Sequence, residues 1–330
     1  MATALQILHD SISFIFSHLL IINVLLSIVV VFFQRRNPKS VWAWLLILYF
    51  IPVLGFVFYL LIGADMHKRK MFRTKEIEDR LANAIRRQEL MIRSQELKEK
   101  YPGVTDYSDL VMYHLHTTSA ILSDDNDVEF FVNGEDKFAA LKEDMRNAKK
   151  SIHIQYYIIK NDELFRSIVE ILKEKVKEGV KVRILYDSMG CWKMRKKIWK
   201  QLEKEGIQCT EFFPALVGRL HLRINYRNHR KIVVIDDCIG YVGGFNIGKE
   251  YIDKDPKFGH WRDTHMRITG SSVTALEARF ILDWNFADRK RLLSYEDYMD
   301  NLKMEHTGRS PIQIITSGPD SHDEYIRNSY

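Results

Sequence analysis

The sequence predicts an α/β protein, in which a membrane-anchoring helical hairpin is followed by a mixed sheet sandwiched by helices. Residues 12–33 and 41–62 are apolar runs without Asp, Glu, Lys or Arg, and each is long enough to cross a bilayer. From residue 128 onward, β-branched apolar segments alternate with amphipathic helical segments. Such alternation is typical of a layered sheet with helices on its faces.

Residues 1–62 are expected to form a two-helix transmembrane anchor. A signal peptide is disfavoured because the first apolar run is too long, no Lys or Arg precedes it, and no small-residue cleavage site is evident. Pro52 and Gly55 lie inside the second run. They leave open a hairpin that enters the membrane and returns on the same side.

Basic residues flank the second run on both sides. The join before it contains Arg35, Arg36 and Lys39. A larger cluster follows it, at Lys68, Arg69, Lys70, Arg73 and Lys75. Because the positive-inside rule favours the larger cluster on the cytoplasmic side, we expect a multi-pass protein of the cell membrane whose N-terminus and catalytic part are cytoplasmic.

Residues 63–127 are expected to form a charged linker with helices. Between residues 65 and 100, apolar residues recur at helical spacing, at Ile77, Leu81, Ile85 and Ile92. This segment is either a solvated connecting helix or a helix lying on an anionic lipid surface. Residues 107–122 predict another helix.

The pattern of residues 128–310 predicts a domain made of the sheet and its helices. The expected strands are residues 128–132, 151–159, 180–186, 231–236, 239–244 and 261–269. The expected helices are residues 138–149, 164–177, 192–205 and 273–286. The helix at 192–205 is basic. A solvated face is its simpler interpretation, and contact with lipid phosphates is the alternative.

One stretch, residues 226–246, contains two linked patterns. H-x-K-x(4)-D and then G-G-x-N are formed by His229, Lys231, Asp236, Gly243, Gly244 and Asn246. The apolar middle predicts a hairpin of two short strands. Side chains alternate along a strand, so the histidine and the lysine share a face and the aspartate points the other way. We expect the aspartate to brace the hairpin or to pair with a basic group behind the site.

The register of this hairpin follows from the turn assumed for it. A two-residue turn at residues 237–238 places Asn246 opposite His229 and Gly244 opposite Lys231. An imidazole, an ammonium and a carboxamide then converge beside a glycine that lets a bulky group approach the backbone. A neutral histidine can attack phosphorus, and lysine and asparagine can donate to phosphate oxygens. The stretch therefore predicts a phosphate site.

The segments NHRKIVVID, YVGGFNIGKEY and WRDTHMRITG resemble the phospholipase D superfamily, and most closely its bacterial cardiolipin synthases. The resemblance implies a phospholipase D-like fold and a phosphatidyl transfer. By this resemblance, His229 is expected to attack the phosphorus of phosphatidylglycerol and release glycerol, after which a second phosphatidylglycerol takes the phosphatidyl group to give cardiolipin. Lys231 and Asn246 are expected to stabilise the phosphoryl oxygens, and Asp263 to accept the Nδ1 proton of His229 in a hydrogen bond. No metal or cofactor is implied.

Three other polar side chains lie near these segments. His153 and Gln155 share one face of a strand and are further candidates for the site. His265 shares the face of Asp263 and is equally consistent with a buried structural histidine.

A short internal repeat occurs near the C-terminus of the chain. VEFFVNGED at residues 128–136 matches IQIITSGPD at residues 312–320, with Gly134 aligned to Gly318 and Asp136 to Asp320. Residues 311–330 are therefore expected to be the truncated start of a second phospholipase D-like domain. In the family, the histidine of the second half is the general acid and base. This chain is expected to need that half, or a second copy, to complete its site.

The composition of the chain narrows the functions that it could have. The net charge of +6 favours an anionic surface, either membrane lipid or nucleic acid. The three cysteines have no metal-ligand spacing, and there is no Walker-type loop. The synthase-like segments and the anchor argue against a nuclease. A hydrolase of the same superfamily and a catalytically incomplete membrane protein stay open.

Overall fold

The computed structural model describes residues 6, 14, 18, 21–25, 27–28, 38–51, 55, 85–92, 102–214, 227–318 and 325–330. The chain forms two compact units, one of residues 1–68 with 215–226 and one of residues 69–214 with 227–330. Much of both apolar runs, and the basic cluster at residues 68–75, lie outside the described residues. The orientation expected from that cluster therefore stays a prediction.

The first unit contains helix α2 (Pro38–Phe50), which lies across the start of the second apolar run. Asn23 donates to the carbonyl oxygen of Leu48 at 3.2 Å, and Trp42, Tyr49 and Phe50 are exposed. Of the helices in the described ranges, none is both long enough and apolar enough to span a bilayer.

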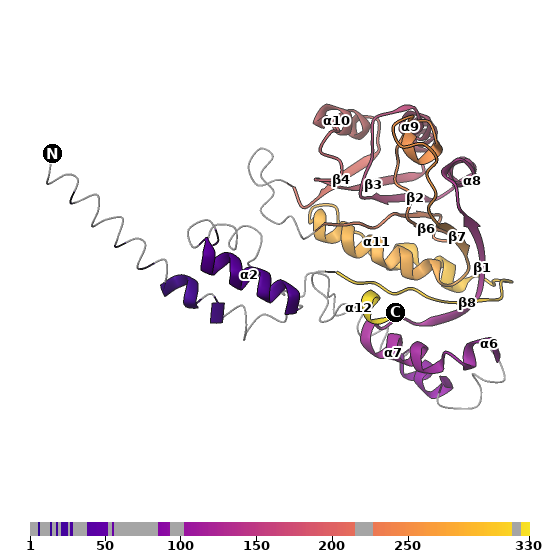
Figure 1. The fold of residues 1–330 in the computed structure, drawn as a ribbon. Helices are drawn as coiled ribbons and strands as arrows, with labels where there is room; N and C mark the ends of the chain where they lie inside the picture. Colours follow the sequence, from indigo (N-terminus) through magenta and orange to yellow (C-terminus); the bar gives the residue numbers. More distant parts are fainter. Residues whose placement is uncertain are drawn as a thin grey trace. The chain divides into compact units, whose positions relative to one another are not determined.

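The second unit is built on a mixed sheet, as predicted (Figure 1). The sheet has eight strands, of which β4 was not predicted. The strand order is β4-β3-β2-β5-β6-β7-β1-β8. β2, β3 and β4 run parallel, whereas the other neighbouring pairs are antiparallel. The strands are β1 (Leu122–Phe131), β2 (Ser151–Tyr156), β3 (Lys181–Asp187), β4 (Gln208–Phe212), β5 (Ile232–Ile235), β6 (Ile239–Gly243), β7 (His265–Thr269) and β8 (Ser310–Gln313).

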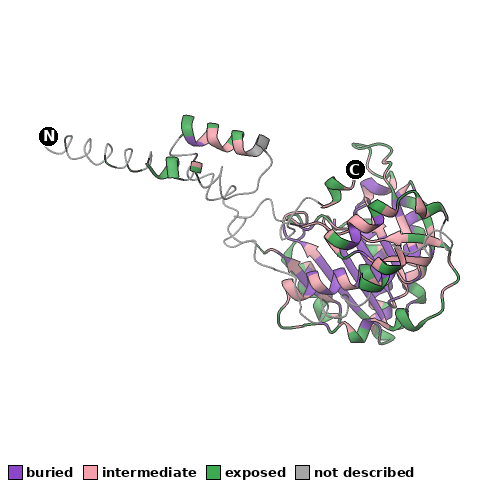
Figure 2. Ribbon diagram, turned by 90° about the horizontal axis from the view of Figure 1, so that it is seen from below, coloured by how far each residue is buried: buried purple, intermediate pink, exposed green. Residues whose placement is uncertain are grey.

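Helices cover both faces of the sheet because alternate strand residues are apolar on each side. One face buries Ile154 and Val233 beneath α8 (Gly134–Asn147), α9 (Glu163–Lys177) and α10 (Lys196–Lys204). On the opposite face, β-strand side chains pack against α11 (Val273–Ala287). Figure 2 shows in purple the buried residues of the central strands, between these layers. The predicted sandwich is confirmed.

The described chain also contains shorter elements, and residues 85–92 are helical. The shorter elements are the helices α6 (Pro102–Thr105), α7 (Ser108–Thr118) and α12 (Tyr325–Asn328) and the 3₁₀ turns η3 (Lys249–Ile252), η4 (Glu296–Tyr298) and η5 (Asp300–Lys303).

Several predicted boundaries were wrong. β1 begins at Leu122, not at residue 128, because the mostly polar segment 122–126 pairs with β8 from far along the chain. β7 begins at His265 rather than residue 261, and α10 at Lys196 rather than residue 192. Residues 310–313 form β8, which pairs antiparallel with residues 122–126 of β1, and Asp320 lies outside the described residues, so the repeat stays a prediction.

Candidate active site

The signature hairpin has a three-residue turn, so the predicted two-residue turn was wrong. Ile235 pairs with Ile239, and Cys238 N donates to Ile235 O at 3.1 Å. Asp236 and Asp237 both have left-handed backbone, with φ of 51° and 64°. Aspartate tolerates this conformation better than most residues, which allows the longer turn. Continuing the register places Lys231 level with Gly243 instead of Gly244.

The two ends of β5 lie at opposite edges of the sheet. His229 and Lys231 precede β5, at the edge where the parallel strands β2, β3 and β4 end. We call this the site edge. Asp236 follows β5, at the edge where β2 begins. Open α/β sheets bind ligands outside the carboxyl ends of their strands, which favours the site edge.

His229 and Lys231 are in direct contact at the site edge. The Nζ atom of Lys231 lies 3.0 Å from Nδ1 and 3.2 Å from Nε2 of His229. It also donates to the His229 carbonyl oxygen at 2.8 Å. The Tyr157 ring packs at 4.7 Å from the imidazole, centroid to centroid. His229 is exposed, whereas Lys231 is only 4% exposed, so the imidazole is accessible above a buried cation.

The surroundings lower both pKa values. Burial, and then the charge of Lys231, hold the pKa of His229 below its ordinary value, with Asp187 opposing. Burial lowers the pKa of Lys231 to about 8, against the charge of Asp263. Within the described ranges, no carboxylate forms an ion pair with Lys231. The site therefore offers a neutral imidazole beside an ammonium that forms no ion pair with a carboxylate of the described residues.

Asp187, which was not among the predicted site residues, fixes the segment that leads into His229. Its carboxylate accepts from Asn228 N at 3.0 Å, and from Met189 N and Gly190 N. The Asn228 side chain donates to the buried Asp283 at 3.0 Å. The available signal was the position of Asp187 directly after a buried parallel strand, where polar groups reach a site.

Gly243 and Gly244 make room for the protein itself, not for a ligand. A Cβ on Gly244 would lie 2.0 Å from Asp263 Oδ1, and one on Gly243 would lie 2.4 Å from His265 Cα. The expected open space beside Gly244 is thus filled by the Asp263 carboxylate. The chain returns to β7 there, with Gly244 N donating to Thr264 O at 2.9 Å.

The structure does not bring Asp263 to the His229 ring. Among the described residues, the imidazole nitrogens have Lys231 as their neighbour, while Asp263 accepts from Thr264 N at 2.7 Å. Since the Asp263 charge still acts on Lys231, it lies close to the site.

Asn246 braces the end of β2 instead of pointing freely at a ligand. Its Oδ1 accepts from Ile158 N at 3.0 Å, and its Nδ2 donates to Tyr251 Oη at 3.0 Å. An amide nitrogen carries two hydrogens. In the hydrogen bonds found between described residues, one of them is used.

His153 and Gln155 lie on the face covered by α11. His153 Nδ1 is 2.6 Å from Glu277 Oε1, which joins the middle of β2 to α11. Gln155, near the carboxyl end of β2, donates at 2.6 Å to Asp283, which also accepts from Asn228, so it supports the segment that leads into His229.

His265 is fully buried, and neither of its ring nitrogens has a hydrogen-bond partner in the described part of the chain. Nor does that part arrange three or more His, Cys, Asp or Glu side chains to hold a metal ion.

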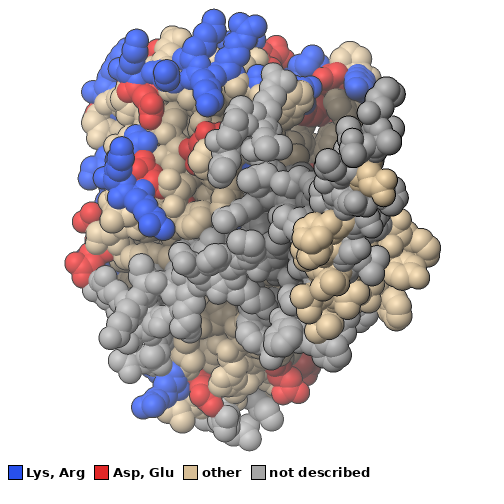
Figure 3. All heavy atoms as spheres, turned by 90° about the vertical axis from the view of Figure 1, so that its left-hand side faces the viewer, with Lys and Arg blue, Asp and Glu red and all other residues tan. Residues whose placement is uncertain are grey.

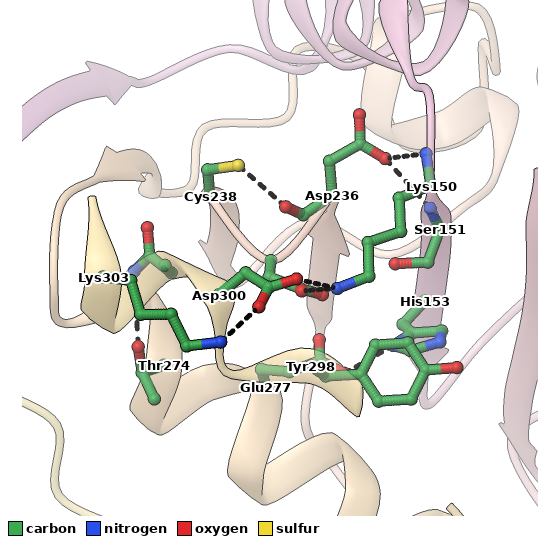
Figure 4. A network of polar contacts seen from close by, with 12 residues as sticks. Lys150, Ser151, His153, Asp236, Cys238, Thr274, Glu277, Tyr298, Asp300 and Lys303 are labelled. Atoms are coloured by element: carbon green, nitrogen blue, oxygen red, sulfur yellow. Dashed lines mark hydrogen bonds and ion pairs between the residues drawn. The ribbon is translucent and has the colours of Figure 1, made fainter. Parts of the chain in front are cut away.

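Asp236 braces the hairpin, as its predicted orientation implied (Figure 4). Its carboxylate accepts from the backbone N–H groups of Lys149, Lys150 and Ser151 at 2.7, 2.6 and 2.9 Å. The start of β2 is thereby tied to the end of β5. Asp236 takes no part in the contacts of His229 described above.

Comparison with known proteins agrees with this arrangement. Residues 141–259 match the family "Cardiolipin synthase, PLD-like domain", and residues 21–63 match "Phospholipase_D-nuclease N-terminal". A cardiolipin synthase of Oceanobacillus iheyensis is 42% identical over 94% of this chain and 64% of its own length. The major cardiolipin synthase ClsA of Bacillus subtilis is 42% identical over 96% of this chain and 66% of its own length.

This chain spans 64% and 66% of the length of these two relatives. Among solved structures, the phospholipase D family member Nuc from Salmonella typhimurium aligns at 17% identity with a TM-score of 0.39, over 49% of this chain and 97% of that one. The matched families cover the hydrophobic N-terminal region and the part that contains the signature hairpin. The chain therefore belongs to the phospholipase D superfamily, in its cardiolipin synthase group, and contains the N-terminal region and one phospholipase D-like domain of that group.

Proposed function

We propose that the site edge transfers a phosphatidyl group between two phosphatidylglycerol molecules. His229 attacks the phosphorus, the bond from phosphorus to the glycerol oxygen breaks, and a phosphatidyl-histidine forms. A hydroxyl of a second phosphatidylglycerol then attacks phosphorus, the P–N bond breaks, and cardiolipin leaves. The observation that carries this proposal is the exposed imidazole of His229 held against the buried Lys231, with both pKa values lowered.

Lys231 supplies the positive charge for the phosphoryl oxygens. In the structure its ammonium contacts a neutral ring and a carbonyl oxygen, so a phosphodiester offers it a better acceptor. When the Lys231 ammonium moves from His229 to the phosphate, the imidazole is free to attack. In this proposal Asp263 then orients the ring and Asn246 donates its second N–H to phosphate.

The leaving glycerol needs a proton, and the attacking hydroxyl must lose one. We propose that this group comes from a second H-K-D half or from a second copy of the chain. The relatives, of which this chain spans 64% and 66%, support a second half. In this scheme residues 128–310 form the first domain and residues 311–330 open the second.

We also propose that residues 1–62 anchor the protein in the cell membrane, as a multi-pass hairpin with the site edge on the cytoplasmic side. The match of residues 21–63 to an N-terminal region of this superfamily supports membrane association. Residues 63–127 then connect the anchor to the catalytic part, whose substrate is an anionic membrane lipid.

A head-group exchange assay tests this function. The purified chain is incubated in detergent with phosphatidylglycerol, alone and with the missing third of ClsA supplied in trans, and products are resolved by mass spectrometry. We expect cardiolipin from the combined proteins and none from the combination with His229→Ala. Phosphatidic acid as the main product would assign a hydrolase instead.

The molar mass of the chain, measured in the same detergent, separates the two sources of the second proton-transfer group. A dimer that makes cardiolipin without the ClsA part would assign that group to a second copy. A monomer that makes cardiolipin at the rate of full-length ClsA would show that no second group is needed and would contradict this part of the proposal.

A further inference from the structure

Five lysines line one side of helix α10 and the turn before it. Within the helix, Lys196, Lys197, Lys200 and Lys204 are spaced i, i+1, i+4 and i+8, which places them along one side, and Lys193 lies in the turn before it. All five are exposed. We call this set the lysine stripe; it consists of Lys193, Lys196, Lys197, Lys200 and Lys204.

Helix stability does not explain the lysine stripe. Lysines four positions apart repel each other, and cations in the first helical turn oppose the helix dipole. The first turn of α10 has no acidic residue. None of the five lysines pairs with an acidic side chain in the described part of the molecule. The helix is instead held by its inner side, where Trp199 stacks on Tyr186 at 3.9 Å and Leu202 is buried.

The stripe starts next to the site edge. The turn between β3 and α10 packs directly on Tyr157, since a Cβ on Gly190 would lie 1.9 Å from the Tyr157 carbonyl oxygen. Cys191 Sγ also donates to this oxygen at 3.5 Å. Because the Tyr157 ring contacts His229, the position of the stripe is fixed relative to the catalytic imidazole.

Exposed aromatic rings accompany lysines on this edge. Trp192 is 56% exposed, and Lys193 Nζ lies 5.3 Å from its ring. Phe258 follows β6 at the same edge, is 46% exposed, and has Lys160 and Lys257 each 5.7 Å from its ring. Exposed aromatic residues beside lysines are typical of surfaces that rest in the headgroup layer of a membrane.

We propose that the lysine stripe, together with Trp192, docks on the surface of an anionic phospholipid bilayer. Figure 3 shows Lys and Arg side chains gathered at the top of one face, at the height where Figure 1 places α10. Docking there holds the site edge against the bilayer that supplies its substrate. The choice of lipid over nucleic acid as the partner rests on the proposed function, whereas the docking itself does not depend on turnover.

Lysine footprinting tests the docking in the full chain. The protein is reconstituted in nanodiscs of phosphatidylcholine alone or with phosphatidylglycerol, and the rate of lysine acetylation is measured residue by residue. We expect Lys196, Lys197 and Lys200 to react severalfold more slowly in the anionic discs. Each lysine near an anionic surface contributes roughly a fivefold gain in binding. The protection should disappear in high salt.

The molecule contains its own matched control. Lys149, Lys177 and Lys181 are exposed and lie at the opposite edge of the sheet, so their reactivity should not change. The variant K196Q/K197Q/K200Q should lose protection of Lys193, whereas K149Q/K177Q/K181Q, with the same change in charge, should keep it. Circular dichroism checks that both variants are folded.

Two outcomes would overturn the proposal. One is equal acetylation of the stripe in neutral and anionic discs. The other is protection by a single-stranded oligonucleotide with none by anionic discs, which would assign the stripe to nucleic acid. His229→Ala should leave the protection intact, so failure of the proposed chemistry and failure of the docking are distinguished.

Discussion

The two ends of β5 hold two parts of one motif, with His229 and Lys231 at one end and Asp236 at the other. Each end also has a lysine nearby, and the two lysines differ in their electrostatic surroundings. At the end of β5 that leads into the hairpin turn, which we call the turn end, Lys150 donates to Asp237 at 2.5 Å and to Asp300 at 2.9 Å. Burial lowers the pKa of Lys150, but these hydrogen bonds outweigh it and hold the pKa above its ordinary value. At the site edge, Lys231 has no such partner among the described residues, and burial lowers its pKa to about 8.

This difference separates bracing from ligand binding. A buried cation without an anionic partner is costly to the fold, and a phosphate oxygen can supply the missing partner. At the turn end, the Asp236 carboxylate of the motif already accepts from three backbone N–H groups. The spacing H-x-K-x(4)-D therefore spans one buried strand, with chemistry proposed at one end and support at the other.

The largest effect is expected from His229→Ala, which should abolish turnover. Phosphatidyl-p-nitrophenol is a suitable substrate, because its leaving group needs no general acid. The exposed imidazole contributes little to the core, so the melting temperature should stay close to that of the parent chain. Release of p-nitrophenol by the variant at the parental rate would remove His229 from the mechanism.

Lys231→Met should lower the rate with the same substrate on the order of 100-fold or more, as expected for loss of a group that stabilises developing charge. Methionine keeps the buried volume and removes the charge. Lys150→Met, at the turn end, is the matched control and should reduce stability while leaving the rate per folded molecule unchanged. Equal rate losses in both variants would erase the distinction between the two ends.

Substitutions of Asp236 and Asp263 test the same comparison between the two ends of β5. Asp236→Ala removes the acceptor of three backbone N–H groups and should lower the free energy of unfolding by about 3 kcal/mol. Asp263→Asn should instead lower turnover by about tenfold or more, as for other residues that orient a catalytic histidine. Urea unfolding and p-nitrophenol release measure the two effects. A loss of turnover in Asp236→Ala together with a loss of stability in Asp263→Asn would refute the roles assigned to the two aspartates.

The pH dependence should be bell-shaped. As pH rises through the lowered pKa of His229, the imidazole becomes neutral and kcat/KM increases. Above a pH of about 8, Lys231 loses its proton in the free enzyme, and kcat/KM decreases. The alkaline decrease should be absent in Lys231→Met. Its persistence there would assign it to another group.

The sequence predicted the features that depend on local patterns. Alternation placed His229 and Lys231 together and turned Asp236 away, and the apolar segments predicted the sandwich. The hairpin register was missed because it depends on two left-handed aspartates, whose conformation leaves no mark in composition. The proximity of Asp263 to Gly244 was missed because it depends on how a loop returns to β7.

The most direct test of the central claim is to trap the covalent intermediate. The chain is mixed with phosphatidyl-p-nitrophenol, quenched, digested and analysed by mass spectrometry. We predict a burst of p-nitrophenol and a phosphatidyl group on His229, with no burst from His229→Ala and a normal burst, per folded molecule, from Asp236→Ala. A phosphatidyl group on any other residue, or a burst that persists in His229→Ala, would contradict the account.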